Sequence, residues 1–436
     1  MVAGDKSDPV DVLVVGGGLA GYVCAIRAAQ NGRFVTLVER ERLGGLCLNR
    51  GCIPSKQLAV YAASKPNASD LRAFQQMRAA AIETLVQGVA GLLQSAGVTT
   101  VSGSAWFVGR TRVCVEVGEE SVRYFDFKDM VIATGSCPTG DESLPVDNER
   151  IFEATAALEW EKVPASLLVA GDDYIAVELA VAFARLGSRV TLAPPSDRVL
   201  PGFDSDLSAA ARRGAESLGV QIVPGAVAET HECVIVSSPR RPNIDSLQLA
   251  AAGIAPTAGY LAVDPQLRVD RHIFAIGDVT PGLALAHRAM AQGLVAGDVL
   301  GSKAAAMDAR AVPRAVFAEP ELASVGITEA EAREQGIEVN VARFPHGALG
   351  RAVLEAATAG FAKLVFARDG MALLGAHLAG PRSTELVNEM ALAIEMGATA
   401  EDLALTMHVH PSFGEAALEA ALLALGRPVH VRRTSR

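Results

Sequence analysis

The sequence lacks the segments that direct a chain into or across a membrane. No apolar run reaches the roughly 18 residues of a spanning helix. Residues Met1–Pro9 are short and polar and contain no signal-peptide core. Six cysteines in 436 residues are too few for a disulfide scaffold. We therefore expect a cytoplasmic protein without membrane contact, in which any disulfide would be catalytic.

Positive charge is also scarce. The 39 lysines and arginines are outnumbered by 49 aspartates and glutamates, which gives a net charge of −10. This balance argues against nucleic acid and anionic membranes as partners. Hydrophobic residues make up 50% of the chain and charged residues 20%, which suffices for a large core. The length predicts about three domains.

Two of the six cysteines lie close together in the segment Gly-Gly-Leu-Cys-Leu-Asn-Arg-Gly-Cys-Ile-Pro-Ser-Lys at 44–56. Pro54 suits the first turn of a helix, which places Cys52 at or next to a helix N-terminus. The partial positive charge there favours a thiolate, and Cys47 is near enough to close a reversible disulfide. The alternatives are two buried cysteines or half of a zinc site, although no second cysteine pair follows. The remaining cysteines are most simply buried small residues: Cys24, Cys114, Cys137 and Cys233.

A strand–turn–helix–strand pattern opens the chain. Val10–Val15 reads as a buried parallel strand, Tyr22–Gln30 as a helix and Phe34–Val38 as the next strand. Between the first strand and the helix stands Gly-Gly-Gly-Leu-Ala-Gly at 16–21. This arrangement is typical of a dinucleotide-binding unit.

Four residues of this unit have expected roles. Gly16 allows the tight turn, Gly18 lets the backbone approach the pyrophosphate, and Gly21 permits close packing of helix and strand. The pyrophosphate would lie on the helix N-terminus. Glu39, at the end of the second strand, is placed to accept hydrogen bonds from ribose hydroxyls. The pattern predicts a site for FAD or NAD.

The cysteine segment and the glycine motif together resemble the flavin-dependent (pyridine nucleotide) disulfide oxidoreductases, with dihydrolipoyl dehydrogenase as the nearest branch. The resemblance runs from Val10 to Val431 and selects FAD as the cofactor. It implies three further flavin contacts. These are Thr134 with Gly135 in Val-Ile-Ala-Thr-Gly, Asp278 in Phe-Ala-Ile-Gly-Asp, and Ala286 at the start of the helix beneath the flavin ring.

The resemblance also implies the fold. We expect an α/β protein with two Rossmann-like units and an α+β dimerisation domain. The FAD-binding domain would comprise residues 1–147 and 269–311, and a shortened NAD(P)-like domain residues 148–268. The interface domain, residues 312–436, would build a homodimer whose active site is shared between subunits.

The NAD(P)-like segment departs from the family. Its first strand is Leu167–Ala170, but Asp173 replaces a family glycine, with Asp172 beside it. Two carboxylates facing a diphosphate in a partly dry site are strongly unfavourable. The second strand runs into Pro194 instead of a ribose-binding acid, and Pro239 replaces another glycine. The segment between Val223 and Val234 is too short for the family's hairpin. We predict an abandoned nucleotide site, with a divergent but working site as the alternative.

Other site residues match the family one by one. The resemblance implies that Lys56 pairs with Glu178 beside the flavin, and that Tyr174 covers the flavin face where nicotinamide would stack. In Met-His-Val-His-Pro-Ser-Phe-Gly-Glu, His410 reads as the acid–base catalyst and Glu415 as the carboxylate that orients it. A metal pair at His-x-His is the alternative, but no third ligand cluster is apparent, so no metal is expected.

The sequence therefore predicts a flavin-dependent oxidoreductase that oxidises a small dithiol through Cys47 and Cys52. The electrons would leave FAD for an acceptor other than NAD(P), such as oxygen, a quinone or a redox partner. One alternative is an NAD-linked dihydrolipoyl dehydrogenase of a 2-oxo acid dehydrogenase complex. Another is a non-catalytic flavoprotein, against which the intact cysteine and His410–Glu415 pairs argue.

Overall fold

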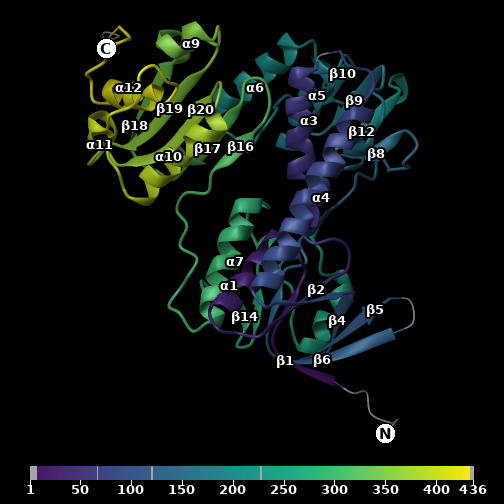
Figure 1. The fold of residues 1–436 in the computed structure, drawn as a ribbon. Coiled ribbons are helices and arrows are strands. Elements are labelled where there is room, and N and C mark those ends of the chain that lie inside the picture. The colour runs from purple at the N-terminus through teal and green to yellow at the C-terminus, as the bar shows by residue number, and fades with distance from the viewer. Residues whose placement is uncertain (1–6, 66, 119–120, 226–227, 433–436) are drawn as a thin grey trace. The chain divides into compact units, whose positions relative to one another are not determined.

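The computed structural model describes residues 7–65, 67–118, 121–225 and 228–432, which form two compact units (Figure 1). Unit 1 takes the chain up to Gln57, Arg72–Ser143 and Ser238–Asp308. Unit 2 takes Leu58–Leu71, Leu144–Ser237 and the chain from Ala309 onward. Residues 1–6 of the polar N-terminal segment lie outside the described residues.

Unit 1 is built on a mostly parallel sheet with the order β14-β15-β6-β1-β2-β3. β1 (Ser7–Val15) pairs in parallel with β2 (Val35–Glu39) and with β6 (Ser121–Ile132). The other strands of the unit are β3 (Thr99–Ser102), β4 (Ser104–Gly109), β5 (Arg112–Val117), β7 (Ser136–Pro138), β13 (Arg240–Pro242), β14 (Arg268–Asp270) and β15 (Ile273–Ala275). Its helices are α1 (Leu19–Gln30), α2 (Gly45–Arg50), the first turns of α3 (Cys52–Ser64), α4 (Arg72–Ser95) and α7 (Ala286–Leu300).

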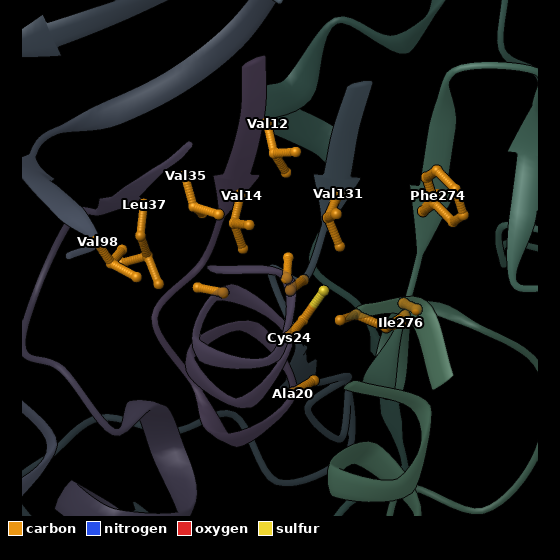
Figure 2. Close-up of a cluster of buried hydrophobic side chains, with 14 of the residues drawn as sticks. Val12, Val14, Ala20, Cys24, Val35, Leu37, Val98, Val131, Phe274 and Ile276 are labelled. Carbon is orange, nitrogen blue, oxygen red and sulfur yellow. The ribbon is translucent and has the colours of Figure 1, made fainter. Parts of the chain in front are cut away.

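Successive side chains of β1 point to opposite faces of the sheet and therefore belong to two different hydrophobic cores. Val12 and Val14 pack with α1 on one face of the sheet, where Figure 2 shows them next to Cys24. Leu13 and Val15 belong to the core on the other face. Both faces are apolar because a parallel sheet is covered on both sides. The expected dinucleotide-binding arrangement of strand, helix and strand is confirmed.

Of the four other cysteines, which were all expected to be buried, only two are buried. Cys24 and Cys114 are buried, whereas Cys137 and Cys233 are half-buried. Cys137 lies in the two-stranded sheet of β7 and β13, and Cys233 is the first residue of its strand. Both side chains are therefore partly accessible to solvent.

Residues 98–107 are rich in apolar side chains but do not form one continuous strand. The chain bends at Gly103, where an added Cβ would lie 2.3 Å from the Glu116 carbonyl oxygen. β3 before the bend joins the parallel sheet beside β2, and β4 after it pairs antiparallel with β5.

Unit 2 contains a second Rossmann-like sheet of five parallel strands, in the order β11-β10-β9-β12-β8. The strands are β8 (Ile151–Glu153), β9 (Ser166–Ala170), β10 (Arg189–Ala193), β11 (Gln221–Ile222) and β12 (Cys233–Val236), with helices α5 (Tyr174–Arg185) and α6 (Ser205–Ser217). Among the described residues between β11 and β12, the regular structure is a single 3₁₀ turn, Ala228–Thr230. The described part of the connection between β11 and β12 therefore adds no further strand to this sheet.

The rest of unit 2 is α+β. Its antiparallel sheet has the order β16-β17-β20-β19-β18 and is packed against helices α10 and α12. The strands are β16 (Arg314–Val316), β17 (Leu322–Gly326), β18 (Val339–Pro345), β19 (Phe361–Ala367) and β20 (Leu373–Ala379). The helices are α8 (Glu329–Glu334), α9 (Gly350–Leu354), α10 (Ser383–Glu395), α11 (Ala400–Leu405) and α12 (Glu415–Ala424). The predicted fold class is confirmed, and the division into three domains stays a prediction.

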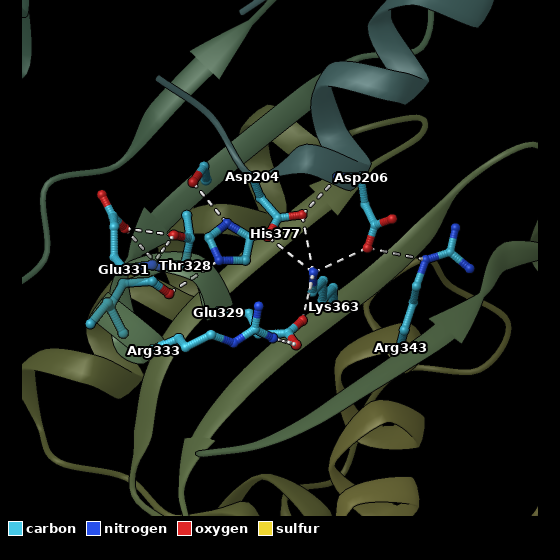
Figure 3. A network of polar contacts seen from close by, with 11 residues as sticks. Asp204, Asp206, Thr328, Glu329, Glu331, Arg333, Arg343, Lys363 and His377 are labelled. Carbon is cyan, nitrogen blue, oxygen red and sulfur yellow. Dashed lines mark hydrogen bonds and ion pairs between the residues drawn. The ribbon is translucent and has the colours of Figure 1, made fainter. Parts of the chain in front are cut away.

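A buried cation joins these two parts of unit 2. The Nζ of Lys363 on β19 lies 3.0 Å from Asp204 and 3.1 Å from Asp206 at the start of α6, and 3.4 Å from Glu329 (Figure 3). Lys363 and Asp204 are 5% and 3% exposed. Burial lowers the pKa of Lys363, but the hydrogen bonds to these carboxylates outweigh it and raise the pKa. The lysine therefore stays charged.

Replacing Lys363 by methionine is expected to lower the free energy of unfolding by about 3–5 kcal/mol, because Asp204 would be left buried without its cation. The measurement is urea unfolding of the FAD-loaded protein. The matched control is Arg368→Met, because Arg368 and Glu338 form an exposed pair worth about 1 kcal/mol or less. Equal effects of the two substitutions would contradict this view of the buried pair.

In the part of the chain that the structure describes, no helix is both long and apolar enough to cross a membrane.

Candidate active site

The glycine motif of unit 1 forms a tight turn between β1 and α1. Gly16 has a φ of +106°, and an added Cβ would lie 2.3 Å from the Ala133 carbonyl oxygen. A Cβ on Gly21 would lie 1.8 Å from the Gly16 carbonyl oxygen. Only glycine fits at either position. α1 begins at Leu19 with Gly18 as its N-cap, and no side chain caps it. Its N-terminal N–H groups are therefore available to an anion.

Glu39 lies at this turn. One of its oxygens accepts a hydrogen bond from the Gly17 N–H at 2.6 Å, and the other accepts from the Glu41 N–H at 2.8 Å. The carboxylate is thereby fixed at the end of β2, next to the glycine motif. This position agrees with a ribose acceptor, and the contact itself stays a prediction.

The cysteine segment starts directly on the glycine motif. The Gly44 N–H donates to the Gly17 carbonyl oxygen at 2.8 Å. A Cβ on Gly45 would lie 2.6 Å from the Cα of Gly18, so the two backbones touch. α2 and α3 follow this crossing. The fold thus brings the redox cysteines and the dinucleotide turn together within unit 1.

Cys47 lies on α2, and α3 begins at Cys52, as Pro54 predicted. The two side chains contact each other. A hydrogen bond to Cys52, together with burial, raises the pKa of the Cys47 thiol, while the charge of Lys56 acts in the opposite direction. The helix N-terminus favours negative charge on Cys52.

Unit 1 has three buried oxygens whose hydrogen-bonding capacity the described residues leave unused. They are Asn49 Oδ1, Gln57 Oε1 and the hydroxyl of Thr134. Asn49 and Gln57 belong to the helices of the cysteines, and Thr134 follows β6. Next to Thr134, a Cβ on Gly135 would meet no atom within 4 Å. Because buried polar atoms are rarely left without partners, these residues fit a large polar cofactor such as FAD.

Asp278, one of the expected flavin contacts, is held in place by neighbours in unit 1. The Ser136 hydroxyl donates to Asp278 at 2.6 Å, and Arg240 donates to the Ser136 hydroxyl at 2.8 Å. α7 begins at Ala286, without a side-chain cap. Like α1, this helix of unit 1 therefore starts without a side-chain cap. These positions agree with the expected flavin contacts of Asp278 and Ala286.

The corresponding turn of unit 2 is different. Asp173 is the N-cap of α5, and its Oδ1 accepts from the Ala176 N–H at 2.9 Å and from the Ser237 hydroxyl at 2.8 Å. Burial raises the pKa of Asp173, and those two hydrogen bonds act in the opposite direction. The nearby charges of Asp172 and Glu178 raise it further. A carboxyl side chain of the protein thus caps this helix start, whereas a glycine caps the start of α1.

Glu178 lies one turn further along α5 and is 5% exposed. Its Oε1 accepts a hydrogen bond from the Phe317 N–H at 3.0 Å. β10 ends at Ala193, directly before Pro194, as the sequence predicted. The pairing of Glu178 with Lys56 and the position of Tyr174 over a flavin stay predictions.

The predicted acid–base pair forms in unit 2. His410 Nδ1 lies 2.8 Å from Glu415 Oε1, and the Ser412 N–H donates to Glu415 Oε2 at 2.8 Å. Burial raises the pKa of Glu415, but these two hydrogen bonds outweigh it, so the pKa is lowered overall. The His410 ring is 77% exposed and presents Nε2 outward. Among the described residues, no three metal-binding side chains lie together.

Comparison with known families identifies the parts of the chain. Residues 10–293 match the family described as "Pyridine nucleotide-disulphide oxidoreductase". Residues 312–421 match "Pyridine nucleotide-disulphide oxidoreductase, dimerisation domain". The two matches together include both the cysteine segment and the His410 loop.

Curated relatives and solved structures agree. The chain is 41% identical to the dihydrolipoyl dehydrogenase of Geobacillus stearothermophilus and 39% identical to that of Bacillus subtilis. These alignments cover 99% of this chain and 99% and 100% of those proteins. The fold resembles the HOCl-induced flavoprotein disulfide reductase RclA of Escherichia coli, with a TM-score of 0.88, 27% identity and coverage of 95% and 99%. It also resembles LpdA of Mycobacterium tuberculosis, with a TM-score of 0.88, 25% identity and coverage of 94% and 99%.

Several residues with evident roles were not found from the sequence. Ser136 and Ser237 hold Asp278 and Asp173, but a serine after a strand carries no specific signal. Asn49 and Gln57 lie inside the cysteine segment and next to Lys56, so their positions could have marked them.

Proposed function

The chain belongs to the pyridine nucleotide-disulphide oxidoreductase family, whose members are FAD-binding enzymes that act on sulfur groups, and from this premise we propose that it oxidises a small dithiol through Cys47 and Cys52. The electrons then leave by way of FAD to an acceptor other than NAD(P). The observation that carries the second part is the Asp173 carboxylate at the start of α5.

The sulfur chemistry follows thiol–disulfide exchange. A substrate thiolate attacks the sulfur of Cys47, the bond between Cys47 and Cys52 breaks, and Cys52 leaves as a thiolate. The second substrate thiolate attacks the substrate sulfur of this mixed disulfide, which releases Cys47 and the oxidised substrate. The start of α3 at Cys52 supports this division of roles, because a helix N-terminus favours negative charge on the leaving sulfur. When bound, FAD accepts the two electrons that this dithiol carries.

His410 removes the thiol protons. Its Nδ1 is engaged by Glu415, so the exposed Nε2 is the nitrogen available to a substrate. The carboxylate fixes the ring and stabilises the imidazolium that forms. The family resemblance implies that His410 acts in the active site of a second copy of the chain.

A homodimer fits the surface of the interface domain. Large apolar side chains around the His410 loop are exposed, with Met407 at 97% and Val409 at 79%. Leu392, Met396 and Leu405, on or next to the helices beside this loop, are more than half exposed as well. An apolar patch of this kind is typical of a protein–protein interface. The match to the dimerisation domain supports the same conclusion.

The proposal that the acceptor is not NAD(P) rests on a comparison of the starts of α1 and α5, each within its own unit. The start of α1 is capped by Gly18 without a side chain and can receive a pyrophosphate. The start of α5 is capped by Asp173, whose Oδ1 accepts from the Ala176 N–H and from the Ser237 hydroxyl. A nucleotide would have to displace this cap, at a cost of about 1 kcal/mol. It would also bring its diphosphate next to Asp172 and Asp173, where like charges repel.

Two further features support an electron acceptor other than NAD(P). Pro194 follows β10 where a ribose-binding acid is expected, so the sugar would lose its partner. The chain between β11 and β12 is too short for the extra hairpin of the family. Restoring glycine at 172 and 173 is therefore not expected to recover the use of NAD.

The second candidate is an NAD-linked dihydrolipoyl dehydrogenase. The names of the curated relatives favour it, because they match this chain over nearly its full length. Under this alternative, Asp173 would move aside when a nucleotide binds. The two candidates share the dithiol half of the reaction and differ in the electron acceptor.

Dihydrolipoamide incubated with the FAD-loaded protein in air is expected to lose two thiols for each hydrogen peroxide formed, because oxygen is the simplest two-electron acceptor. The measurement follows thiols and peroxide together, with and without NAD⁺. Addition of NAD⁺ should not increase the rate. Thiol loss that requires NAD⁺ and yields NADH would favour the second candidate.

A further inference from the structure

His408 lies in the loop between α11 and α12 that carries His410 (Figure 1). Its ring is 7% exposed, whereas the side chains of Met407, Val409 and His410 point to solvent. The Nδ1 of His408 lies 2.9 Å from the Thr406 carbonyl oxygen. Its Nε2 lies 3.0 Å from the Glu389 carboxylate on α10. His408 therefore ties the loop to itself on one side and to a neighbouring helix on the other.

Both partners of the ring can only accept hydrogen bonds. A carbonyl oxygen and a carboxylate have no proton to donate, so each ring nitrogen must carry its own. A neutral histidine has a single N–H and can satisfy only one of them. We propose that His408 is an imidazolium at neutral pH whose two hydrogen bonds hold the His410 loop in its working position. Its effect on turnover rests on the proposed function.

The charged groups around His408 agree with this assignment. Glu389 acts on it from α10, and Glu415 acts on it from the start of α12. The hydrogen bond to Glu389 raises the pKa of His408, and burial opposes this only in part. The double contact is therefore present at pH values below this raised pKa. It is lost as the pH rises through it.

The link from His408 to His410 is short. The two residues are separated by Val409, and the backbone then turns at Pro411 toward Ser412, whose N–H is bound by Glu415. Between Leu405 and Pro411, His408 is the side chain that packs inward; the others are exposed. If either hydrogen bond of His408 is lost, the chain between Leu405 and Pro411 is held less firmly on the N-terminal side of His410. His410 would then lose its fixed position while keeping its own chemistry, so His408 is a positioning residue.

Replacing Glu389 by glutamine is expected to lower the pKa of His408 and to move the alkaline limb of the dithiol turnover profile down by about one pH unit. At pH values well above the parent limb, kcat should be about tenfold lower than in the parent protein, with little change in the KM for the dithiol. The matched control is Glu385→Gln, an exposed glutamate on the same helix, which should leave the profile in place. An unchanged profile in Glu389→Gln would overturn the positioning role.

A second readout does not depend on turnover. Histidine ring resonances are followed by NMR in the FAD-loaded protein with isotope-labelled histidine, and His408→Asn identifies the signal of His408. At neutral pH, both ring nitrogens of His408 should be protonated, and the His410 resonances should shift in Glu389→Gln but not in Glu385→Gln at alkaline pH. A neutral His408 ring, or an unmoved His410 signal, would overturn the inference. If the parent protein oxidises no dithiol, the proposed function fails, and these resonances still decide the role of His408.

Discussion

Replacing Cys52 by serine is expected to lower dithiol turnover by roughly 10⁴-fold or more, because the exchange reaction loses its leaving sulfur. The hydroxyl of serine cannot form the disulfide with Cys47 or carry a thiolate charge at neutral pH. FAD should stay bound, because the glycine motif and Glu39 are unchanged. Turnover is measured with dihydrolipoamide, and cofactor content by the flavin absorbance of the purified protein.

The partner substitution separates the roles of the two sulfurs. Cys47→Ser should lose turnover to a similar degree. Because it leaves Cys52 without a disulfide partner, it should show a long-wavelength absorbance shoulder without any reductant. In the parent protein, mild dithiol treatment should produce this shoulder, and in Cys52→Ser it should be absent. An ordinary flavin spectrum in Cys47→Ser would show that the roles are reversed.

Replacing His410 by alanine is expected to lower dithiol turnover by about 10²–10⁴-fold while FAD stays bound. The loss arises because no other group would accept the thiol proton at the position that Glu415 fixes. Cys47 and Cys52 remain, so a strong chemical reductant should still open their disulfide. The rate of flavin reduction by dihydrolipoamide, measured in a stopped-flow instrument without oxygen, reports this step directly.

The control for His410 is an exposed histidine that also pairs with a carboxylate. His272 lies 3.2 Å from Asp129 and is 53% exposed, in the other unit of the chain. His272→Ala should keep parental turnover. Near-parental turnover in His410→Ala would remove this residue from the mechanism.

The parts of the site that could be predicted are those specified by neighbouring residues. The turn at Gly16 and the start of α3 at Cys52 follow from a few consecutive residues whose backbone preferences agree. The pairing of His410 with Glu415 follows from five positions of spacing around Pro411. Local geometry determines each of these features, so the sequence pattern is sufficient.

Features that depend on distant segments were missed. Asp173 was predicted as an unfavourable charge, but its hydrogen bond with the hydroxyl of Ser237, which follows β12, joins segments far apart in the sequence. Lys363 meets Asp204 and Glu329 only after the sheets have formed. The bend at Gly103 depends on the Glu116 carbonyl in a neighbouring strand. No pattern within a short window of sequence contains these partners.

The most direct test of the account is anaerobic stopped-flow reduction of the bound flavin by three reductants compared side by side. A small dithiol such as dihydrolipoamide should bleach the flavin absorbance rapidly. NADH and NADPH at millimolar concentration should leave it unchanged, because the proposed function takes the Asp173 cap at the start of α5 to exclude a pyrophosphate. Rapid bleaching by NADH would contradict the account and identify the chain as an ordinary NAD-linked dehydrogenase.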